Sequence, residues 1–501
     1  MIPLSFAQRR LWFVDRFEGP SPTYNGAFAL RLTGELDVDA LRAALHDVVD
    51  RHEVLRTVIV EDDDGVPHQQ VLAQGHEQVT LPLSEVTPRT RDAAVDRAAK
   101  QTFDLATDVP IRAVLLRCTP RDHTLVLVVH HIALDGESLG PLLRDLTTAY
   151  TARRDHHAPQ WQPLPVQYAD YTLWLQELLG SEDDPDSSVS RQLAFWKAAL
   201  DGIPDQLELP FDRPRPKVAD YRGDTVPIRI DADLHRALLG LARESNTTLF
   251  MVLQAALATL LSRLGAGSDI PLGTPVAGRT DEALDDLVGF FVNTLVLRND
   301  TSGNPTFREL LARTRATDLA AYSHQDVPFE RLVEAINPQR SLARHPLFQV
   351  IFGVDATGGS ALNLPGLTVA QESVPIEFSR FDLGFNFVEQ YGVDSGPAGI
   401  SGLLHYSTDL FDRESVEALV TRMVRVVEAA VADPDRPLGR IEILSAGEQR
   451  QILETWNETG AALTDATLPA LFQSQVALTP RRPAVLAPDT DLSYGELNER
   501  A

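Results

Sequence analysis

The sequence has a single cysteine, Cys118, among 501 residues. One cysteine excludes an intrachain disulfide and a zinc site made of several cysteines. Because Cys118 ends an apolar, strand-like run, we interpret it as a buried structural thiol rather than a reactive one. The chain also lacks an uninterrupted apolar stretch of membrane-spanning length, and its N-terminus has no signal-peptide pattern. These absences predict a cytoplasmic protein with no membrane partner.

Basic residues are scarce relative to acidic ones. Lys and Arg number 45 against 71 Asp and Glu, which gives a formal net charge of -26. A chain of that charge repels phosphate backbones, so we expect no nucleic-acid partner. The length of 501 residues predicts more than one domain, and a hydrophobic content of 44% is sufficient for large cores.

Strands and helices alternate along the chain in two blocks, and a Pro-rich segment at 204–216 opens the second block. Between residue 62 and a helix expected at 91–103, we expect turns and irregular chain. In the second block we expect one extended sheet that includes strands at 348–354, 367–374, 381–387 and 400–406. Mixed elements in two blocks predict two α/β lobes with a cleft between them.

The segment 124–140, TLVLVVHHIALDGESLG, contains the densest group of candidate functional residues. Its apolar run at 125–129 predicts a strand buried on both faces. His130 and His131 follow, and Asp135 with Gly136 marks a turn before a helix. Because side chains alternate along a strand, the two imidazoles should face opposite ways, and at most one of them should point into any cavity.

His131 is the candidate for acid–base chemistry, because imidazole titrates near neutral pH. The N-terminus of the following helix could place backbone N–H groups where negative charge develops. We therefore assign His131 and Gly136 to the catalytic set and His130 to a structural role. We interpret Asp135 as a buried acid held by an arginine, because an unpaired buried carboxylate is costly.

Two other chemistries fit parts of this segment less well. Residues 136–140 match the G-x-S-x-G pattern of α/β-hydrolases, but residues 130–136 separate Ser138 from the strand, so we expect Ser138 to cap or begin a helix. A metal site made of His130, His131 and Asp135 is disfavoured, because adjacent histidines on a strand diverge.

The segment resembles the HHxxxDG motif of nonribosomal peptide synthetase condensation domains, and the chain carries further motifs of that family in the same order. Residues 5–12 resemble SxAQxRLW, 51–57 resemble RHExLRT, and 168–174 resemble YxDYxxW. Further matches are GTPVAGR ending at Arg279, GFFVNT at 289–294, the pattern at 324–330, RHPLF at 344–348 and FDL at 381–383. The resemblance covers roughly residues 2–450.

This resemblance implies an α/β fold of two chloramphenicol-acetyltransferase-like lobes, which form a V-shaped pseudodimer with a central tunnel. We place the N-terminal lobe at 1–178 and the C-terminal lobe at 179–445, followed by a linker at 446–466. Residues 467–501, which include LSYGELN, resemble the start of an adenylation domain. A piece that short cannot build its own core. We expect a monomer.

The resemblance also implies the reaction. A peptidyl or aminoacyl thioester donor and an aminoacyl thioester acceptor arrive on the 4'-phosphopantetheine arms of an upstream and a downstream peptidyl carrier protein, and a peptide bond forms. No intrinsic cofactor or metal is expected, and an adenylation domain is the expected neighbour. The match to RHExLRT, with Glu53 and Thr57, favours a donor with an L-configured terminus.

Residue roles follow from the same resemblance. The residue that matches His131 faces the reaction centre, and the residue that matches Asp135 pairs with the arginine that matches Arg279. We expect Trp12, Glu137, Ser138 and Asn293 along the substrate tunnel. Family members often carry an aromatic residue at position 137, so Glu137 leaves the shape of the acceptor pocket open.

Thioester aminolysis needs no strong base, because part of an α-amino group with a pKa of about 7.7–8.0 is already neutral at pH 7. We therefore expect His131 to position the amine by hydrogen bonding and to accept its proton. Rival interpretations are an epimerisation domain, a non-catalytic recruiting module of the same fold and, from another class, an α/β-hydrolase thioesterase that uses Ser138.

Overall fold

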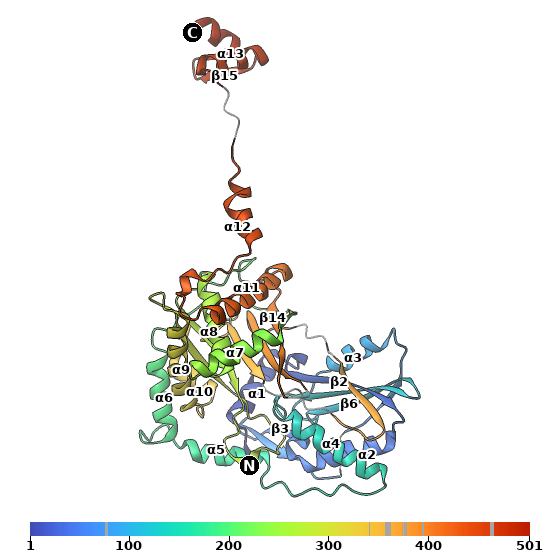
Figure 1. Ribbon diagram of the computed structural model, residues 1–501. Coiled ribbons are helices and arrows are strands. Elements are labelled where there is room, and N and C mark those ends of the chain that lie inside the picture. Colours follow the sequence, from blue (N-terminus) through green and yellow to red (C-terminus); the bar gives the residue numbers. More distant parts are fainter. Residues whose placement is uncertain are drawn as a thin grey trace. The chain divides into compact units, whose positions relative to one another are not determined.

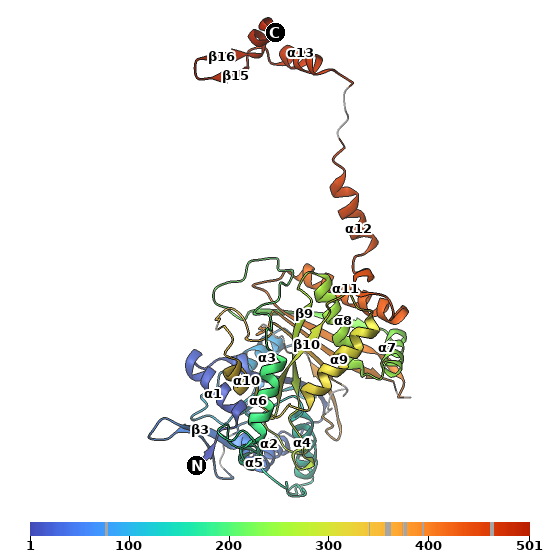
Figure 2. The ribbon, with the colours of Figure 1, turned by 90° about the vertical axis from the view of Figure 1, so that its left-hand side faces the viewer.

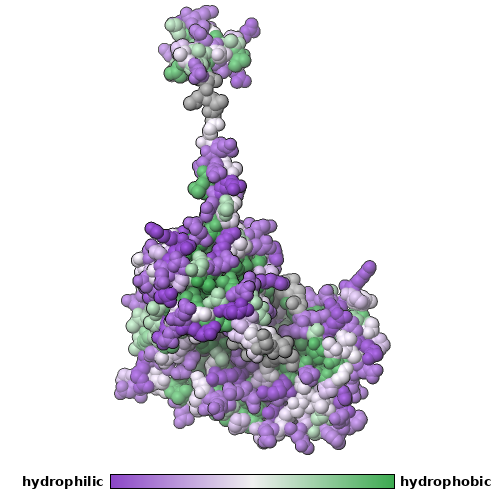
Figure 3. Space-filling view, viewed as in Figure 1, coloured by the Kyte–Doolittle hydropathy of each residue, from purple (hydrophilic) through white to green (hydrophobic). Residues whose placement is uncertain are grey.

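The computed structural model describes residues 1–75, 79–339, 341–355, 362–372, 374, 378–392, 395–460 and 465–501. It divides into two compact units, Met1–Ile443 and Leu444–Ala501. Figure 1 shows that the first unit contains the large sheets and most of the helices. The surface visible in Figure 3 is mostly hydrophilic, and hydrophobic residues appear there as separate patches.

A five-stranded sheet forms the first half of the first unit, in the order β12-β2-β7-β6-β5. Its central strand β7 is buried along almost its whole length, as the apolar run predicts. The strands of this sheet are β2 (Asn25–Gly34), β5 (Leu83–Glu85), β6 (Ile111–Thr119), β7 (Asp122–His130) and β12 (Leu367–Glu372). Cys118 in β6 is only partly buried, which corrects the prediction of a buried thiol; burial and Asp122 raise the pKa of the thiol.

Strand β12 belongs to this first sheet although it lies far along the chain. It pairs antiparallel with β2, and Leu367 lies opposite Gly34. A Cβ at Gly34 would lie 2.6 Å from the carbonyl oxygen of Gly366, so the close approach of the two strands requires glycine there. The prediction that this strand belongs to the sheet of the second block is therefore wrong.

A small sheet in the order β1-β4-β3 accompanies the first sheet. It consists of β1 (Ile2–Pro3), β3 (Thr57–Glu61) and β4 (Pro67–Val71), so the stretch expected to be irregular contains β4 and β5. The helical segments of this half are α1 (Phe6–Glu18), η1 (Pro22–Tyr24), α2 (Val38–Arg51), η2 (Glu53–Arg56), α3 (Arg91–Ala99), α4 (Leu139–Arg154) and α5 (Tyr168–Leu179). Apolar residues of α2 and α4 share one hydrophobic core with β7.

A six-stranded sheet forms the second half, in the order β10-β9-β11-β13-β14-β8. Strand β11 pairs in parallel with both β9 and β13, and the other pairs are antiparallel. The strands are β8 (Gly223–Ile230), β9 (Asp269–Val276), β10 (Asn293–Asp300), β11 (Val350–Asp355), β13 (Leu383–Tyr391) and β14 (Pro397–Ser407).

Helices cover both faces of this sheet. Figure 2 shows α8 and α9 on one side of β9 and β10, with α6 and α10 on the other. The helical segments are α6 (Ser188–Ala199), α7 (Ala232–Glu244), α8 (Leu249–Arg263), η3 (Glu282–Leu284), α9 (Phe307–Tyr322), α10 (Phe329–Ile336), α11 (Arg413–Ala432) and η4 (Leu438–Arg440). Of the helices described, none by itself is long and apolar enough to cross a membrane, and only the pair α7 and α8, bent by 101°, meets those criteria together.

The second unit is small. It contains α12 (Ala446–Leu453), η5 (Thr455–Asn457), α13 (Leu468–Leu478), β15 (Pro483–Ala487), β16 (Thr490–Ser493) and α14 (Tyr494–Arg500). None of its described residues is buried, and Leu468 is 82% exposed. The unit therefore has no hydrophobic core of its own among the residues described.

Candidate active site

The end of β7 positions the two histidines. The His130 N–H donates a hydrogen bond to the carbonyl of Pro110, and the His131 N–H donates to the carbonyl of Tyr24, each at 2.8 Å. The chain then turns through buried apolar residues to Asp135, and α4 begins at Leu139. The sequence of strand, histidine pair, acid and helix is therefore present as predicted.

The two imidazoles occupy different surroundings. His130 is 3% exposed and packs against the rings of Tyr24 and Phe103. Its Nδ1 accepts a hydrogen bond from the N–H of Ile132 at 3.1 Å. Burial, together with the neighbouring His131, lowers the pKa of His130 to about 3. His130 is therefore a neutral, packed side chain at physiological pH, which fits a structural role.

His131 lies on the wall of a cavity of about 280 Å³ between the two halves of the first unit. Its Nδ1 is 3.0 Å from the carbonyl oxygen of Leu134. A carbonyl only accepts hydrogen bonds, so Nδ1 carries the proton and Nε2 is a proton acceptor. Burial lowers the pKa of His131, as does the positive charge of Arg380, while the carbonyl of Leu134 and the carboxylate of Asp135 act against this. The geometry thus presents a neutral imidazole with a basic nitrogen.

Asp135 accepts hydrogen bonds through both carboxylate oxygens. Oδ1 accepts from the N–H and the hydroxyl of Ser138, at 2.9 and 2.6 Å, and Oδ2 accepts from the N–H of Phe291 at 2.8 Å. Arg279 Nη2 lies 3.6 Å from Oδ1, and both side chains are buried. The acid is therefore held by an arginine and by backbone from the second half of the unit, in the pairing that the resemblance implies.

Ser138 is fully buried within this network. Its hydroxyl lies 2.7 Å from Arg279 Nη2 and 3.1 Å from the N–H of Gly289, which both donate to it. It does not line the cavity that contains His131, so the prediction of Ser138 along the substrate tunnel is wrong for this structure. Its contacts also leave the hydrolase interpretation without support, because a buried hydroxyl that donates to Asp135 and accepts from Arg279 and Gly289 has no access to a substrate carbonyl.

Of the other predicted tunnel residues, one lines the cavity and two do not. Asn293 lines the cavity, but its amide is engaged: Nδ2 donates to the carbonyls of Gln325 and Val327, and Oδ1 accepts from the N–H of Phe329. Trp12 packs against the core of the first sheet, and Glu137 is exposed; neither lines the His131 cavity.

Gly136 lies on the cavity wall, where it is exposed. A Cβ built at this position would have no atom within 4 Å. The backbone of Gly136 is therefore open to the same space as the imidazole of His131. For the metal alternative, the described residues include no group of three His, Cys, Asp or Glu side chains suited to hold an ion.

The segment 288–291 of the second half is fastened to the first half by residues of three motifs. Tyr168 Oη donates to the carbonyl of Phe290 at 2.7 Å and lies 2.9 Å from the hydroxyl of Ser5. His52 Nδ1 accepts from the N–H of Val288 at 3.4 Å. Because the same segment contacts Asp135 and Ser138, these motifs help to fix the turn that carries His131.

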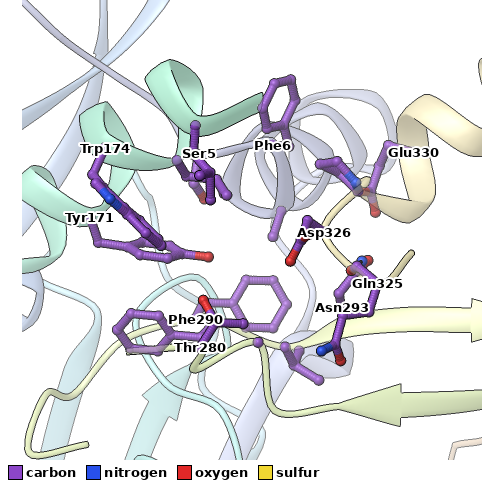
Figure 4. Close-up of a pocket in the computed structure, with 17 residues that line it drawn as sticks. Ser5, Phe6, Tyr171, Trp174, Thr280, Phe290, Asn293, Gln325, Asp326 and Glu330 are labelled. Atoms are coloured by element: carbon purple, nitrogen blue, oxygen red, sulfur yellow. The ribbon is translucent and has the colours of Figure 1, made fainter. Parts of the chain in front are cut away.

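A second pocket shares walls with the His131 cavity. Figure 4 shows Ser5, Tyr171, Phe290 and Asn293 around it. Phe290 and Asn293, together with Glu330, line both spaces. The segment at 290–293 thus separates two hollows at the junction of the halves.

Sequence reasoning missed several residues of the cavity wall, among them Tyr24, Phe290, His345 and Arg380. His345 lies in a motif that the sequence displays, yet its role was not assigned. It stacks on Phe329, with ring centroids 5.4 Å apart, and burial lowers its pKa to about 3. No signal in the sequence indicated Tyr24 and Arg380, because their contact joins distant segments.

A family model described as "Condensation domain" matches residues 1–453. The chain is 53% identical over 501 residues to CymA of Salinispora arenicola, a probable nonribosomal peptide synthetase, and 50% identical over 500 residues to a dimodular nonribosomal peptide synthase of Bacillus subtilis. Both matches cover 100% of this chain but only 6% and 21% of those proteins, so the chain corresponds to a small part of each.

The fold is similar to that of a solved structure, the X-domain from teicoplanin biosynthesis, which another structure shows in complex with OxyB. The TM-score is 0.82 at 38% sequence identity, over 88% of this chain and 98% of that chain. The two α/β halves are the chloramphenicol-acetyltransferase-like pseudodimer that the family resemblance implies. The chain therefore belongs to the condensation domain family, whose acyl-transfer reaction forms peptide bonds in nonribosomal peptide synthetases.

Proposed function

We propose that this chain joins a donor thioester to an acceptor amine in the cavity lined by His131 and Gly136. One observation carries the proposal: a neutral imidazole, with Nδ1 held by the carbonyl of Leu134, lies on the wall of a cavity between the two halves. Nε2 of His131 is then the acceptor for a proton or a hydrogen bond from the attacking amine.

The chemistry is an aminolysis. The acceptor nitrogen attacks the donor carbonyl, the C–N bond forms and the C–S bond breaks, and the phosphopantetheine thiolate leaves and takes up the proton that the amine gives up. Alignment of amine and carbonyl in one cavity can contribute about 7–11 kcal/mol. A well-placed general base adds roughly 10²–10⁴-fold. The N–H of Gly136, on the same wall, is the proposed donor to the developing oxyanion.

Carrier proteins are the proposed partners. A donor carrier upstream and an acceptor carrier downstream deliver the substrates on 4'-phosphopantetheine, and the chain itself contributes no cofactor. An adenylation domain is the proposed neighbour, because residues 467–501 resemble its first segment. No residue described in the second unit is buried, which supports this, since the remainder of such a domain would cover its exposed apolar side chains.

Selection of an L-configured donor is proposed from the match to RHExLRT. Thr57 donates through its hydroxyl to the carbonyl of Glu53 at 2.7 Å, and neither residue lines the His131 cavity. These residues would therefore act on stereochemical selection through the fold and not by contact. This point is tested by the rate of dipeptide formation from carriers loaded with matched L- and D-configured donors. Equal rates would contradict selection of an L-configured donor.

A non-catalytic recruiting module is the second candidate, because the chain is 38% identical to an X-domain that has been solved in complex with another protein, OxyB. The retained His131 in an open cavity favours the enzyme. The two functions separate in one assay: donor- and acceptor-loaded carrier proteins are mixed with the chain, and dipeptidyl carrier is measured by mass spectrometry.

The decisive variant is His131→Ala, with Glu137→Ala as the matched control on the exposed neighbour. The enzyme interpretation predicts dipeptide from the wild type and from Glu137→Ala, and a loss of about 10²-fold or more from His131→Ala. Full yield from His131→Ala would contradict a catalytic role for His131. Absence of dipeptide from the folded wild-type chain would favour the non-catalytic recruiting module.

A further inference from the structure

We infer that Arg380 is a positioning residue for His131. It acts from the opposite half of the unit as a clamp: it holds Thr23 and Tyr24, and Tyr24 in turn holds the backbone of His131. The inference rests on the proposed function, because it concerns the same imidazole. No sequence motif marks Arg380 as functional. Because its contacts cross from one half to the other, the position of His131 depends on how the two halves are arranged.

The clamp consists of two contacts on consecutive residues of η1. Arg380 Nη2 donates to the carbonyl oxygen of Thr23 at 2.6 Å, and its guanidinium carbon lies 3.3 Å from the centre of the Tyr24 ring. A guanidinium over an aromatic face at this distance is a strong cation–π arrangement. Arg380 precedes β13 of the six-stranded sheet, whereas η1 leads into β2 of the five-stranded sheet.

The same residues of η1 hold His131. The carbonyl of Tyr24 accepts the His131 N–H at 2.8 Å, and Asn25, the next residue, pairs with His130 in the sheet. The ring of Tyr24 also packs against that of His130. Displacement of Thr23 and Tyr24 therefore moves the end of β7, so a contact that fixes them also fixes the backbone of His131.

Arg380 also contributes charge to the cavity. Arg380, Tyr24 and His131 line it together. The ionisable groups on its wall are Arg10, Tyr24, His131, Asp135, Glu330, His345 and Arg380. Arg10 is paired with Glu330 at 3.1 Å, and Asp135 is held by Arg279. Burial lowers the pKa of His131 most, the charge of Arg380 lowers it further, and Asp135 is the acid that opposes this. The guanidinium thus favours the neutral imidazole that aminolysis needs.

The segment around Arg380 has other anchors, so the clamp can be removed without loss of the fold. Asp382 forms an ion pair with Arg215, and its N–H donates to the carbonyl of Gln349 at 3.0 Å. The Ser379 N–H donates to the carbonyl of Tyr221 at 2.8 Å. These contacts keep the start of β13 in place when the side chain of residue 380 is changed.

The test compares Arg380→Gln and Arg380→Lys with the wild type and with the control Arg222→Gln, which changes an exposed arginine paired with Asp220 and Asp409. Single-turnover dipeptide formation from loaded carriers is measured from about pH 5.5 to 9. The His131 imidazole is titrated separately by NMR of labelled histidine, with His131→Ala to assign its signal.

Arg380→Gln is expected to slow the reaction about 10²-fold, the loss typical of a misplaced catalytic group, and to raise the pKa of His131, so that the acid limb of the rate profile moves to higher pH. Arg380→Lys should keep the position of the acid limb but lose much of the rate, because an ammonium lacks the planar fork. Arg222→Gln should behave as the wild type, because Arg222, Asp220 and Asp409 do not line the cavity.

An unchanged rate or an unchanged titration of His131 in Arg380→Gln would overturn the inference. So would equal losses in Arg380→Gln and Arg380→Lys with no shift of the acid limb, since that pattern indicates a structural role alone. A wild-type rate from His131→Ala is a different failure: it removes the proposed function of His131, whereas the NMR titration still reports whether Arg380 acts on the imidazole.

Discussion

Asp135 and Arg279 are separated by 3.6 Å, and the hydroxyl of Ser138 bridges them, 2.6 Å from Asp135 and 2.7 Å from Arg279. The acid lies in the turn between β7 and α4 in the first half, and the arginine follows β9 in the second. The turn that bears His131 is therefore stabilised by a buried polar network that crosses the junction of the halves. This network positions the turn, whereas the proposed chemistry is assigned to residues on the cavity wall.

We predict that Asp135→Ala and Arg279→Ala each destabilise the chain more than His131→Ala does. Removal of one partner leaves the other as an uncompensated buried charge, which costs roughly 3–5 kcal/mol. His131→Ala removes a partly exposed ring with one hydrogen bond and should cost no more than about 1 kcal/mol. Urea unfolding followed by circular dichroism gives all three values, and the reverse order would contradict the assignment of roles.

Buried histidines make the stability of the fold depend on pH. Burial lowers the pKa of His130 and His345 to about 3, and it lowers the pKa of His52 as well. The unfolded chain then binds more protons than the folded chain below about pH 6.5, so stability falls as the pH drops from there towards 3. We expect a loss on the order of 1 kcal/mol per pH unit for each histidine.

The measurement for this prediction is urea unfolding at several pH values between about 7.5 and 4.5. His345→Gln should flatten the slope, because it removes one of these groups. His157→Gln, at an exposed loop position, is the matched control and should leave the slope unchanged. A slope that is the same in all three proteins would show that buried histidines do not govern acid stability here.

The sequence predicted elements whose signal is local. The apolar run at 125–129 predicts β7, and the helical spacing beyond Glu137 predicts α4. It did not predict β4, PHQQV, or β5, whose three residues are exposed, because these strands exist through pairing with β1, β3 and β6 and not through their own composition. Strand β12 was predicted but assigned to the wrong sheet, since its partner β2 lies far away in sequence.

The candidate site divides in the same way. Motif resemblance pointed to His131, Asp135 and Arg279. It could not show that Ser138 bridges the last two, because the contact between Ser138 and Arg279 joins residues 141 positions apart. The contact of Arg380 could not be predicted for the same reason, since its hydrogen bond to Thr23 joins residues 357 positions apart.

Asp318 gives a pH dependence of the opposite sign. It is 0% exposed in α9, and burial raises its pKa to about 7, although Gln254 donates to it at 3.0 Å. Between its ordinary value near 3.8 and about 7 the folded chain binds more protons than the unfolded chain, so this contribution to stability is lost as the pH rises. We predict that Asp318→Asn is more stable than the wild type at pH 8, by at least about 1 kcal/mol, and not at pH 4.

Unfolding in urea at both pH values checks this prediction. Asp300→Asn serves as control, because the pKa of this exposed carboxyl is lowered by the hydroxyl of Ser302 and its replacement should bring no gain at pH 8. An equal stability difference for Asp318→Asn at both pH values would mean that Asp318 is not protonated in the fold at neutral pH.

Two glycines next to the cavity should respond in opposite ways to alanine. A Cβ at Gly289 would lie 2.4 Å from the ring of Tyr168 and 2.5 Å from that of Phe291, and the hydroxyl of Tyr168 is tied to Ser5 and Phe290. The ring has no room to move, so Gly289→Ala should cost about 1–3 kcal/mol or more and should slow dipeptide formation, because the segment that anchors Asp135 is displaced.

Gly136→Ala is the matched variant, since a Cβ there meets no atom within 4 Å. It should leave the free energy of unfolding within about 0.5 kcal/mol of the wild-type value. Because the new methyl group enters the space that His131 shares, we expect the rate of dipeptide formation to fall while the fold persists. A wild-type rate from Gly136→Ala would place the reacting carbonyl away from Gly136 and remove its backbone N–H from the proposed mechanism.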